Sequence, residues 1–347
     1  MRVAQLGELA LIERLKRLFC AREPAAAESV ISGRLRVGIG DDAAVVESQG
    51  ALALCVDSIE AGCDWLPDRT PPEAIGHRAA AVNLSDLAAM GAAPQWLLVA
   101  LRLDPNDEVS AIERAAAGMQ ALAVAHGTRV IGGDLDIGVG PQRWTVTAAG
   151  SLVGSPMCRD AARPGDLIWL IGEVGRAAIG LQWLTREPSD ASERRSWPPS
   201  VDDPAYAHLA PQPLVAAGCA LAASGARVAT IDVSDGLWLD AERLARASAV
   251  DLELDVSRPR WLGGALTTWC ARRQIDWRAA CAAGGDDYAL LVAAEASLDV
   301  AAVVAATGCV TAVQAIGHAR TGGGDVRLRI AGEVPQVAQR GHLYGLS

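Results

Sequence analysis

The sequence predicts an α+β fold in two domains, residues 1–153 and 154–347. Its 347 residues are enough for two domains of ordinary size, each with its own core. Stretches with apolar residues at helical spacing alternate with short apolar runs typical of strands, so both halves are expected to hold mixed sheets with helices. Hydrophobic residues make up 51% of the chain but aromatic residues only 4%, so the cores must consist mostly of Ala, Val and Leu.

In the first domain, apolar periodicity and flanking turn residues predict the elements in chain order. The expected helices are residues 7–20, 71–91 and 107–125. The expected strands are two around a glycine loop within residues 36–46, followed by 51–59, 96–103, 129–131 and 143–152. The short strand 129–131 is expected to open onto a loop that contains Gly132, Gly133 and Asp134.

The second domain is expected to begin after a turn at residues 163–166. Strands are expected at residues 167–171, 227–231, 250–256, 288–293 and 311–316, and helices at 213–223, 237–247 and 298–306. Residues 187–203 are rich in Pro, Ser, Arg and Asp, which favours irregular structure. The glycine-rich segment 321–325 is interpreted as a hairpin turn.

Composition excludes several classes of protein. Residues 290–310 are the most apolar stretch, but Glu295 and Asp299 interrupt it, so no membrane span is expected. Glu8 lies where a secretory signal would be apolar, and the eight cysteines include no C-x-x-C pair, so a cytoplasmic protein is expected. The formal charge of −10 argues against nucleic-acid binding. Lys16 is the only lysine, which excludes a P-loop, so phosphates must be bound by arginine, backbone N–H groups and metal.

The predicted helix at 71–91 carries a polar pair on a neighbouring face to its apolar residues. Asn83 and Asp86 are three residues apart, so their side chains lie together. A carboxylate inside an apolar helix is costly unless a cation or hydrogen bonds compensate it. A helix cap or a solvated face is the alternative, but other acidic motifs in the chain favour a metal-ligand role for Asp86.

Six short acidic motifs lie where predicted strands or helices begin or end. They are Asp41–Asp42, Asp57–Ser58, Asp86, Asp134, Asp232–Asp235 and Asp286–Asp287. Any single motif would suit a surface turn. Gathered in one site, two unit charges about 4 Å apart would repel by ~4 kcal/mol at an effective dielectric constant of ~20. Mg²⁺ removes that repulsion and prefers carboxylates, water and phosphate oxygens, so the set predicts a Mg–nucleotide site.

The motifs together resemble thiamine-monophosphate kinase, and they span nearly the whole chain in the family's order. The matching segments are Gly38–Asp42, Ala81–Ala92, Ile131–Asp134, Asp232–Leu237 and Gly284–Tyr288. The resemblance implies the two-domain fold of aminoimidazole ribonucleotide synthetase, with the N-terminal domains of a homodimer forming a β-barrel and a C-terminal α/β domain covering the ATP cleft. It also implies transfer of phosphate from ATP to thiamine monophosphate, assisted by several Mg²⁺ ions.

The resemblance also implies roles for individual residues. The Mg²⁺ ligands would be Asp42, Asp57, Asp86, Asp134, Asp232 and Asp235, of which Asp86 and Asp235 would be catalytic. Nucleotide contacts would come from Gly133, Asp134, Arg159 and Ser234, and substrate contacts from Asp64, Asp286 and His342.

The acceptor side departs from the family pattern, because Asp64 stands where the family commonly has a histidine. An anionic side chain there should repel a phosphate unless a metal or a cationic substrate group intervenes. Two alternatives therefore stay open: a paralogue that uses the same Mg–ATP site on another phosphorylated or carboxylated acceptor, and a dimeric scaffold that binds nucleotide without turnover.

Overall fold

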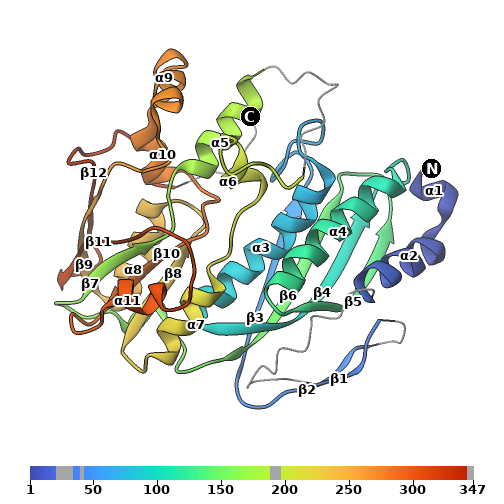
Figure 1. Ribbon diagram of the computed structural model, residues 1–347, viewed down its shortest axis with the longest axis horizontal. Helices are drawn as coiled ribbons and strands as arrows, with labels where there is room; N and C mark the ends of the chain where they lie inside the picture. Colours follow the sequence, from blue (N-terminus) through green and yellow to red (C-terminus); the bar gives the residue numbers. More distant parts are fainter. Residues whose placement is uncertain (21–33, 40–42, 188–196, 342–347) are drawn as a thin grey trace.

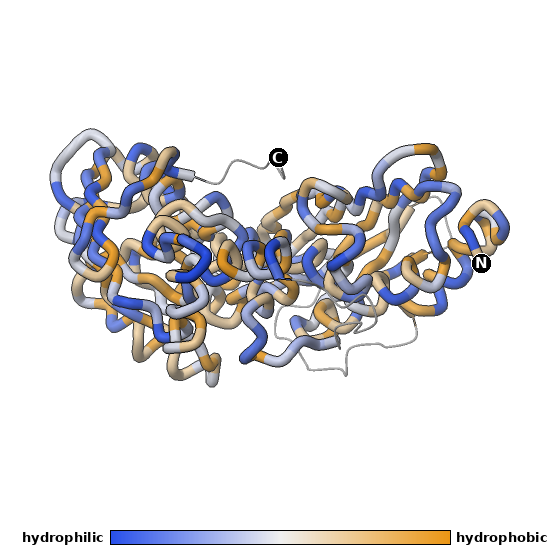
Figure 2. Tube along the Cα trace, turned by 90° about the horizontal axis from the view of Figure 1, so that it is seen from above, coloured by the Kyte–Doolittle hydropathy of each residue, from blue (hydrophilic) through white to orange (hydrophobic). Residues whose placement is uncertain are grey.

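The computed structural model describes residues 1–20, 34–39, 43–187 and 197–341. Two lobes lie side by side along the long axis of the molecule (Figures 1 and 2). One lobe carries a four-stranded sheet and the other a six-stranded sheet, and a two-stranded ribbon lies apart from both. The predicted α+β architecture with mixed sheets is confirmed.

The first lobe holds the elements up to residue 152. Its helices are α1 (Val3–Leu6), α2 (Glu8–Cys20), α3 (Pro72–Met90) and α4 (Val109–Ala125). Its strands are β1 (Arg34–Val37), β2 (Val45–Glu47), β3 (Leu52–Glu60), β4 (Ala92–Leu103), β5 (Arg129–Ile137) and β6 (Arg143–Leu152). The pair β1–β2 forms the separate antiparallel ribbon.

The sheet of the first lobe has the order β3-β6-β4-β5, and only the β4–β5 pair is parallel. Helices α3 and α4 cover one face of it (Figure 1). Side chains alternate between the faces of a strand, and on β4 and β6 the buried residues that alternate with more exposed ones lie under the helices. The opposite, open face exposes Leu54, Val56 and Leu98.

Helix α3 lies at the centre of the molecule. It contacts β3, β4, β6 and α4 in its own lobe, and also α7 and β8 of the second lobe. Most of its residues are therefore buried, including the polar Asn83 and Ser85. It ends at Gly91, whose φ of 71° is left-handed and therefore suits glycine. A helix buried on all sides can present side chains to both lobes at once.

The second lobe holds the remaining elements. Its helices are η1 (Arg159–Ala161), α5 (Arg176–Arg186), α6 (Tyr206–Leu209), α7 (Val215–Ala223), α8 (Leu237–Ser248), α9 (Gly264–Arg272), α10 (Trp277–Ala283) and α11 (Val300–Ala305). Its strands are β7 (Leu167–Ile171), β8 (Val228–Val233), β9 (Val250–Val256), β10 (Ala289–Ala294), β11 (Val313–Thr321) and β12 (Val326–Ile330).

The six strands of this lobe have the order β12-β9-β11-β7-β10-β8, with only β12–β9 parallel. Both faces of the sheet are buried. On β10, Leu290 and Val292 belong to a core shared with α3 and α7, whereas Leu291 and Ala293 belong to the core under α8. The continuous core between the lobes fixes β8, and the acidic residues at its end, against α3.

Several predicted elements need correction. Strand β5 runs through Gly132, Gly133 and Asp134, which were expected to form a loop, because these residues pair with β4. Helices α5, α9 and α10 and strand β12 were not predicted. Residues 321–325 do not form a hairpin turn, because β11 and β12 lie on opposite sides of β9. Asp251 on β9 accepts hydrogen bonds from the N–H groups of Gly323, Gly324 and Asp325 instead.

Candidate active site

A cavity of about 370 Å³ opens where the two lobes meet. Five aspartates line it: Asp57, Asp64, Asp86, Asp232 and Asp235. The other lining residues are Ser58, Ile59, Cys63, Val82, Ser234 and Tyr288. Strand β3 and the turn after it, helix α3, and the end of β8 with its following turn thus contribute side chains to one acidic pocket. The structure brings together acidic residues separated by up to about half of the chain.

Helix α3 and strand β3 place two of the carboxylates. Asn83, one turn before Asp86 on α3, donates from its Nδ2 to the Ala79 carbonyl at 3.1 Å and is buried. Asp86 lies one residue beyond the buried Ser85 and lines the cavity. Asp57 reaches it from β3, which packs against α3.

A buried hydrogen bond joins the two lobes at the cavity. The Ser85 hydroxyl on α3 donates to Asp232 Oδ2 at 2.8 Å, and both residues are buried. A hydrogen bond to a carboxylate at this distance fixes its orientation. The sequence placed Ser85 inside a motif but gave it no role, because its partner lies 147 residues away.

The turn after β8 carries Asp235. Its carboxylate lies 2.5 Å from Arg243 Nη1, and its backbone N–H donates to Asp240 Oδ2 at 3.0 Å. Gly236 follows with a φ of 113°, and a Cβ there would come within 2.9 Å of the Ala283 carbonyl carbon. Glycine is therefore required at this turn by both conformation and space. Asp240 and Arg243 were not predicted.

The ionised form of the aspartates in this pocket is unfavourable without a bound cation. Burial raises the pKa of Asp86 to about 7, and the charges of Asp232 and Asp57 add to the shift. Burial also raises the pKa values of Asp57 and Asp232, with neighbouring aspartates contributing. The positive charge of Arg159 lowers the pKa of both Asp86 and Asp232, but not enough to offset burial. Like charges with raised pKa values are the condition that a divalent cation relieves.

The donor set suits a hard cation. It offers carboxylate and hydroxyl oxygens, the ligands that Mg²⁺ prefers, and its only thiol, Cys63, is exposed. Over the described part of the chain, however, no three His, Cys, Asp or Glu side chains lie close enough to hold an ion as they stand. Side-chain movement or further ligands are needed to complete a coordination shell.

Asp134 and Gly133 lie away from this cavity. Strand β5 is three strands from β3, so at about 4.8 Å per strand the Asp57 and Gly133 row spans ~14 Å. Asp134 pairs with Ala100 and lies exposed on the open face of the sheet. A Cβ on Gly133 would lie 2.0 Å from the Val99 carbonyl oxygen, so this position requires glycine for strand packing.

The predicted nucleotide contacts divide between two places. Ser234 lines the cavity, and its carbonyl accepts from the Asp286 N–H at 2.8 Å. Arg159 begins the short helix η1 and is exposed, and its charge acts on the buried carboxylates. Asp42 and His342 lie outside the described residues.

Of the three predicted substrate residues, the two that the structure describes, Asp64 and Asp286, differ in whether they line the cavity. Asp64 lines the cavity, although its Oδ2 also accepts from the Glu60 N–H at 2.7 Å and so closes the turn after β3. Burial raises its pKa. Asp286 is buried and pairs with Arg78 on α3 at 2.6 Å, while the Tyr288 hydroxyl donates to it at 3.1 Å. Its carboxylate therefore joins the lobes in this structure.

Comparison with known proteins places this architecture. Residues 40–155 match the family "AIR synthase related protein, N-terminal domain", and residues 163–329 match "AIR synthase related protein, C-terminal domain". The fold and the acidic site thus define a member of the AIR synthase related class. Among curated proteins, the thiamine-monophosphate kinase of Mycobacterium tuberculosis (strain H37Rv) is 33% identical over 291 residues, covering 83% of this chain and 80% of its own.

Solved structures agree with this relation. The thiamine-monophosphate kinase of Stenotrophomonas maltophilia K279a has a TM-score of 0.74 and 32% identity, covering 95% of this chain and 98% of its own. AaThiL complexed with AMPPCP and TMP has a TM-score of 0.67 and 25% identity, covering 98% of each chain. The chain belongs to the thiamine-monophosphate kinase family, which confirms the resemblance found in its sequence motifs.

Proposed function

We propose that the protein transfers the γ-phosphate of ATP to thiamine monophosphate, giving thiamine diphosphate and ADP. The acidic cavity between the lobes is the observation that carries this proposal, together with the family's activity. A related chain of the same fold is known in complex with AMPPCP and TMP. The acceptor phosphate oxygen forms a bond to the γ-phosphorus as the bond to the ADP oxygen breaks, without a covalent enzyme intermediate.

Four residues of this cavity, Asp57, Asp86, Asp232 and Asp235, would hold Mg²⁺. When bound, Mg²⁺ would neutralise charge on the transferring phosphate and on ADP. Ser85 keeps Asp232 aimed at the site through its hydrogen bond. Arg159 supplies positive charge near Asp86 and Asp232, as Arg243 does beside Asp235. Ser234 would contact the nucleotide, and Asp64 the acceptor.

We propose that the remaining predicted residues serve the same reaction once substrates and a second copy of the chain are bound. These residues are Asp42, Gly133 and Asp134 on the nucleotide and metal side, and Asp286 and His342 on the substrate side. Asp134 on the open face of the sheet would act beside a second copy of the chain, since it lies away from its own cavity. Asp286 would act through Arg78, by holding the lobes in place around the substrate.

The proposed assembly is a homodimer in which the open faces of two N-terminal sheets meet in a β-barrel. Leu54, Val56 and Leu98 on that face are 69%, 61% and 41% exposed, which is costly for aliphatic side chains left in water. Glu60 pairs with Arg143 along one edge of the face, so the apolar patch has a charged border. Domain limits of 1–153 and 154–347 fit this arrangement, because the sheet ends at residue 152.

Replacing both Leu54 and Val56 by aspartate is expected to convert the dimer into monomers at micromolar concentration. Each substitution would bury a charge against the partner's apolar face. Sedimentation velocity measures the result. Asp68→Asn, on an exposed turn outside the sheet, is the control. A wild-type protein that is monomeric at all concentrations, or a double variant that stays dimeric, contradicts this assembly.

We place the protein in the cytoplasm, without nucleic-acid or membrane partners, on the evidence of its composition. The net charge is −10. Among the described helices, none is both long and apolar enough to span a bilayer.

An acceptor panel tests the proposed reaction. Thiamine monophosphate is compared with other phosphorylated and carboxylated acceptors in a coupled ADP-release assay with Mg–ATP, and the product is identified by mass. Formation of thiamine diphosphate is the expected result. Transfer only to another acceptor would favour the paralogue that Asp64 suggests, and absence of transfer to any acceptor would favour the non-catalytic scaffold.

A further inference from the structure

Arg159 lies in a short turn that has few hydrogen bonds of its own to stabilise it. It begins η1, a single three-residue 3-10 turn that follows an extended residue, Cys158. Such a short turn satisfies few of its own backbone groups and has poor hydrogen-bond geometry. A guanidinium presented from it would sample many positions unless the surrounding protein fixes the turn.

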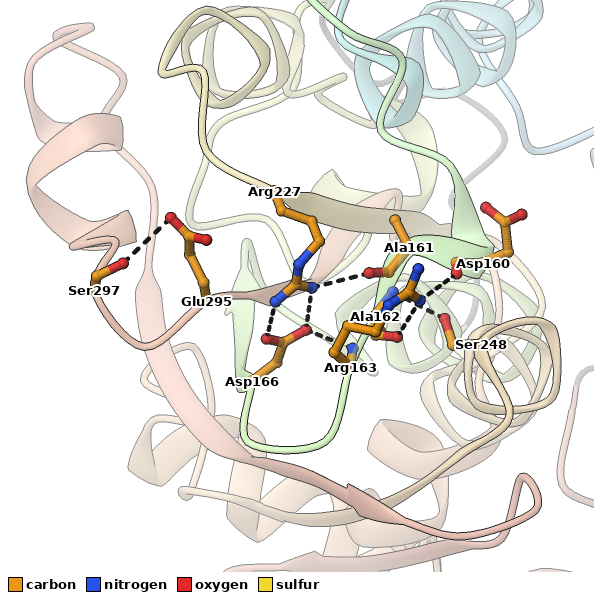
Figure 3. Close-up of polar contacts among 9 residues, drawn as sticks. All are labelled: Asp160, Ala161, Ala162, Arg163, Asp166, Arg227, Ser248, Glu295 and Ser297. Carbon is orange, nitrogen blue, oxygen red and sulfur yellow. Dashed lines mark hydrogen bonds and ion pairs between the residues drawn. The ribbon is translucent and has the colours of Figure 1, made fainter.

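Two side chains from elsewhere in the chain and the neighbouring Arg163 form hydrogen bonds with the backbone groups of this turn (Figure 3). Ser248, the last residue of α8, donates from its hydroxyl to the Arg159 carbonyl at 2.6 Å and accepts from the Ala162 N–H at 3.0 Å. Arg227 donates from Nη1 to the Ala161 carbonyl at 2.9 Å. Arg163 donates to the Asp160 and Ala162 carbonyls at 2.9 and 2.8 Å.

A buried carboxylate, Asp166, holds the Arg227 side chain in place. Asp166 is 2% exposed and receives both Arg227 Nη1 and Nη2, at 2.7 and 2.6 Å. It also accepts from the Arg163 N–H at 2.7 Å, so one carboxylate organises the two arginines (Figure 3). The paired geometry leaves Arg227 one orientation, with its remaining donor capacity directed at the turn.

We infer that Ser248 and the Asp166–Arg227 pair are positioning residues for Arg159, and that they set nucleotide affinity without touching the nucleotide. This rests on the proposed function, in which Arg159 contacts the nucleotide. The Ser248 hydroxyl donates to the carbonyl of Arg159 itself, so loss of this hydroxyl should free the turn at Arg159. Asp166–Arg227 acts one step further away, through the Ala161 carbonyl.

A double-mutant cycle tests this inference, with binding of AMPPCP measured by calorimetry so that no turnover is required. Ser248→Ala is expected to weaken AMPPCP binding about tenfold, the effect of losing hydrogen bonds that restrain one side chain. In an Arg159→Ala background the same Ser248→Ala change should have no further effect, because the residue it positions is gone. Arg227→Lys keeps the charge but loses the paired geometry, and should behave like Ser248→Ala.

Ser297→Ala is the matched control. Ser297 lies at the same corner of the lobe and donates to Glu295 at 3.2 Å, away from the turn (Figure 3). It should leave AMPPCP affinity unchanged. Melting temperatures of all variants establish that they are folded, and Ser248→Ala removes only one hydroxyl from a half-buried position.

The possible results of these binding measurements separate the positioning role from the nucleotide site and from the proposed acceptor. Equal losses from Ser248→Ala with and without Arg159, or no loss in either, overturn the positioning role. Absence of AMPPCP binding to the unsubstituted protein overturns both this inference and the nucleotide site. Intact binding and coupling without phosphorylation of thiamine monophosphate leave the inference standing and overturn only the proposed acceptor.

Discussion

Asp86→Asn is expected to lower phosphoryl transfer by roughly 10³-fold or more, because it removes a metal-binding charge from the centre of the pocket. Asparagine has nearly the same volume, and the charges of Asp232 and Asp57 both act on Asp86, beside the effect of its burial. Steady-state kinetics at saturating Mg–ATP measure the loss. The fold should survive, since the substitution also removes a repelling charge from a buried site.

Asp68→Asn is the matched control for this variant. It makes the same chemical change on an exposed turn after β3, outside the pocket. Turnover in Asp68→Asn should equal that of the unsubstituted protein. Turnover of Asp86→Asn within a few fold of wild type at saturating Mg²⁺ would remove Asp86 from its assigned role.

The second large effect is that stabilisation by Mg²⁺ should grow as the pH rises. The pKa of Asp86 is raised to about 7 in the folded protein, above its ordinary value of 3.8. The folded state therefore holds a proton that the unfolded state has released. Without metal, the free energy of unfolding should fall as pH rises from about 4 to about 7.

Mg²⁺ binds the ionised form, so its stabilising effect should be small near pH 5 and should grow towards pH 8. Denaturant unfolding in EDTA and in Mg²⁺ at a series of pH values measures both trends. Burial also raises the pKa of Asp240 to about 7 and of Asp287 to about 8, and it raises the pKa values of Asp57 and Asp232, so part of the metal-free trend belongs to these four residues. The difference between wild type and Asp86→Asn isolates the contribution of Asp86. An Mg²⁺ effect that is equal at all pH values would contradict the account.

The sequence identified the acidic residues of the pocket because each lies at the end of a strand or within a helix of recognisable pattern. Asp57 and Asp232 lie near the ends of strands and Asp86 lies one turn before the end of a helix, and each is part of an apolar run that could be read directly. Strands β6, β7 and β9 were predicted with the bounds that the structure gives them. Local periodicity carries this information without knowledge of the tertiary fold.

The partners of these residues could not be predicted. Ser85 with Asp232, and Arg78 with Asp286, are contacts between lobes, and no spacing in the sequence pairs them. The Gly132–Gly133 pair suggested a loop, but the close approach of β4 to β5 makes glycine necessary inside a strand. Asp134 followed the glycines in the motif and was grouped with the pocket, whereas strand order places it on another face.

Asp287 is another residue whose partners could not be predicted from the sequence. Its neighbours Asp286 and Tyr288 have φ values of 68° and 52°, and its carboxylate accepts from the Gly175 and Ala177 N–H groups at 2.5 and 2.9 Å. The motif therefore serves the start of α5, an element that the sequence analysis did not predict. Strain of this kind is retained where surrounding contacts fix the backbone.

The central claim is that the pocket between the lobes holds the metal ions and the phosphates. Crystals grown with Mn²⁺ and AMPPCP would locate the metal by anomalous scattering, since Mn²⁺ takes the same oxygen ligands as Mg²⁺. The account predicts metal peaks bonded to Asp86 and Asp232, with the Arg159 guanidinium directed at the phosphates. Metal and nucleotide bound outside this pocket, with Asp86 and Asp232 free of both, would contradict it.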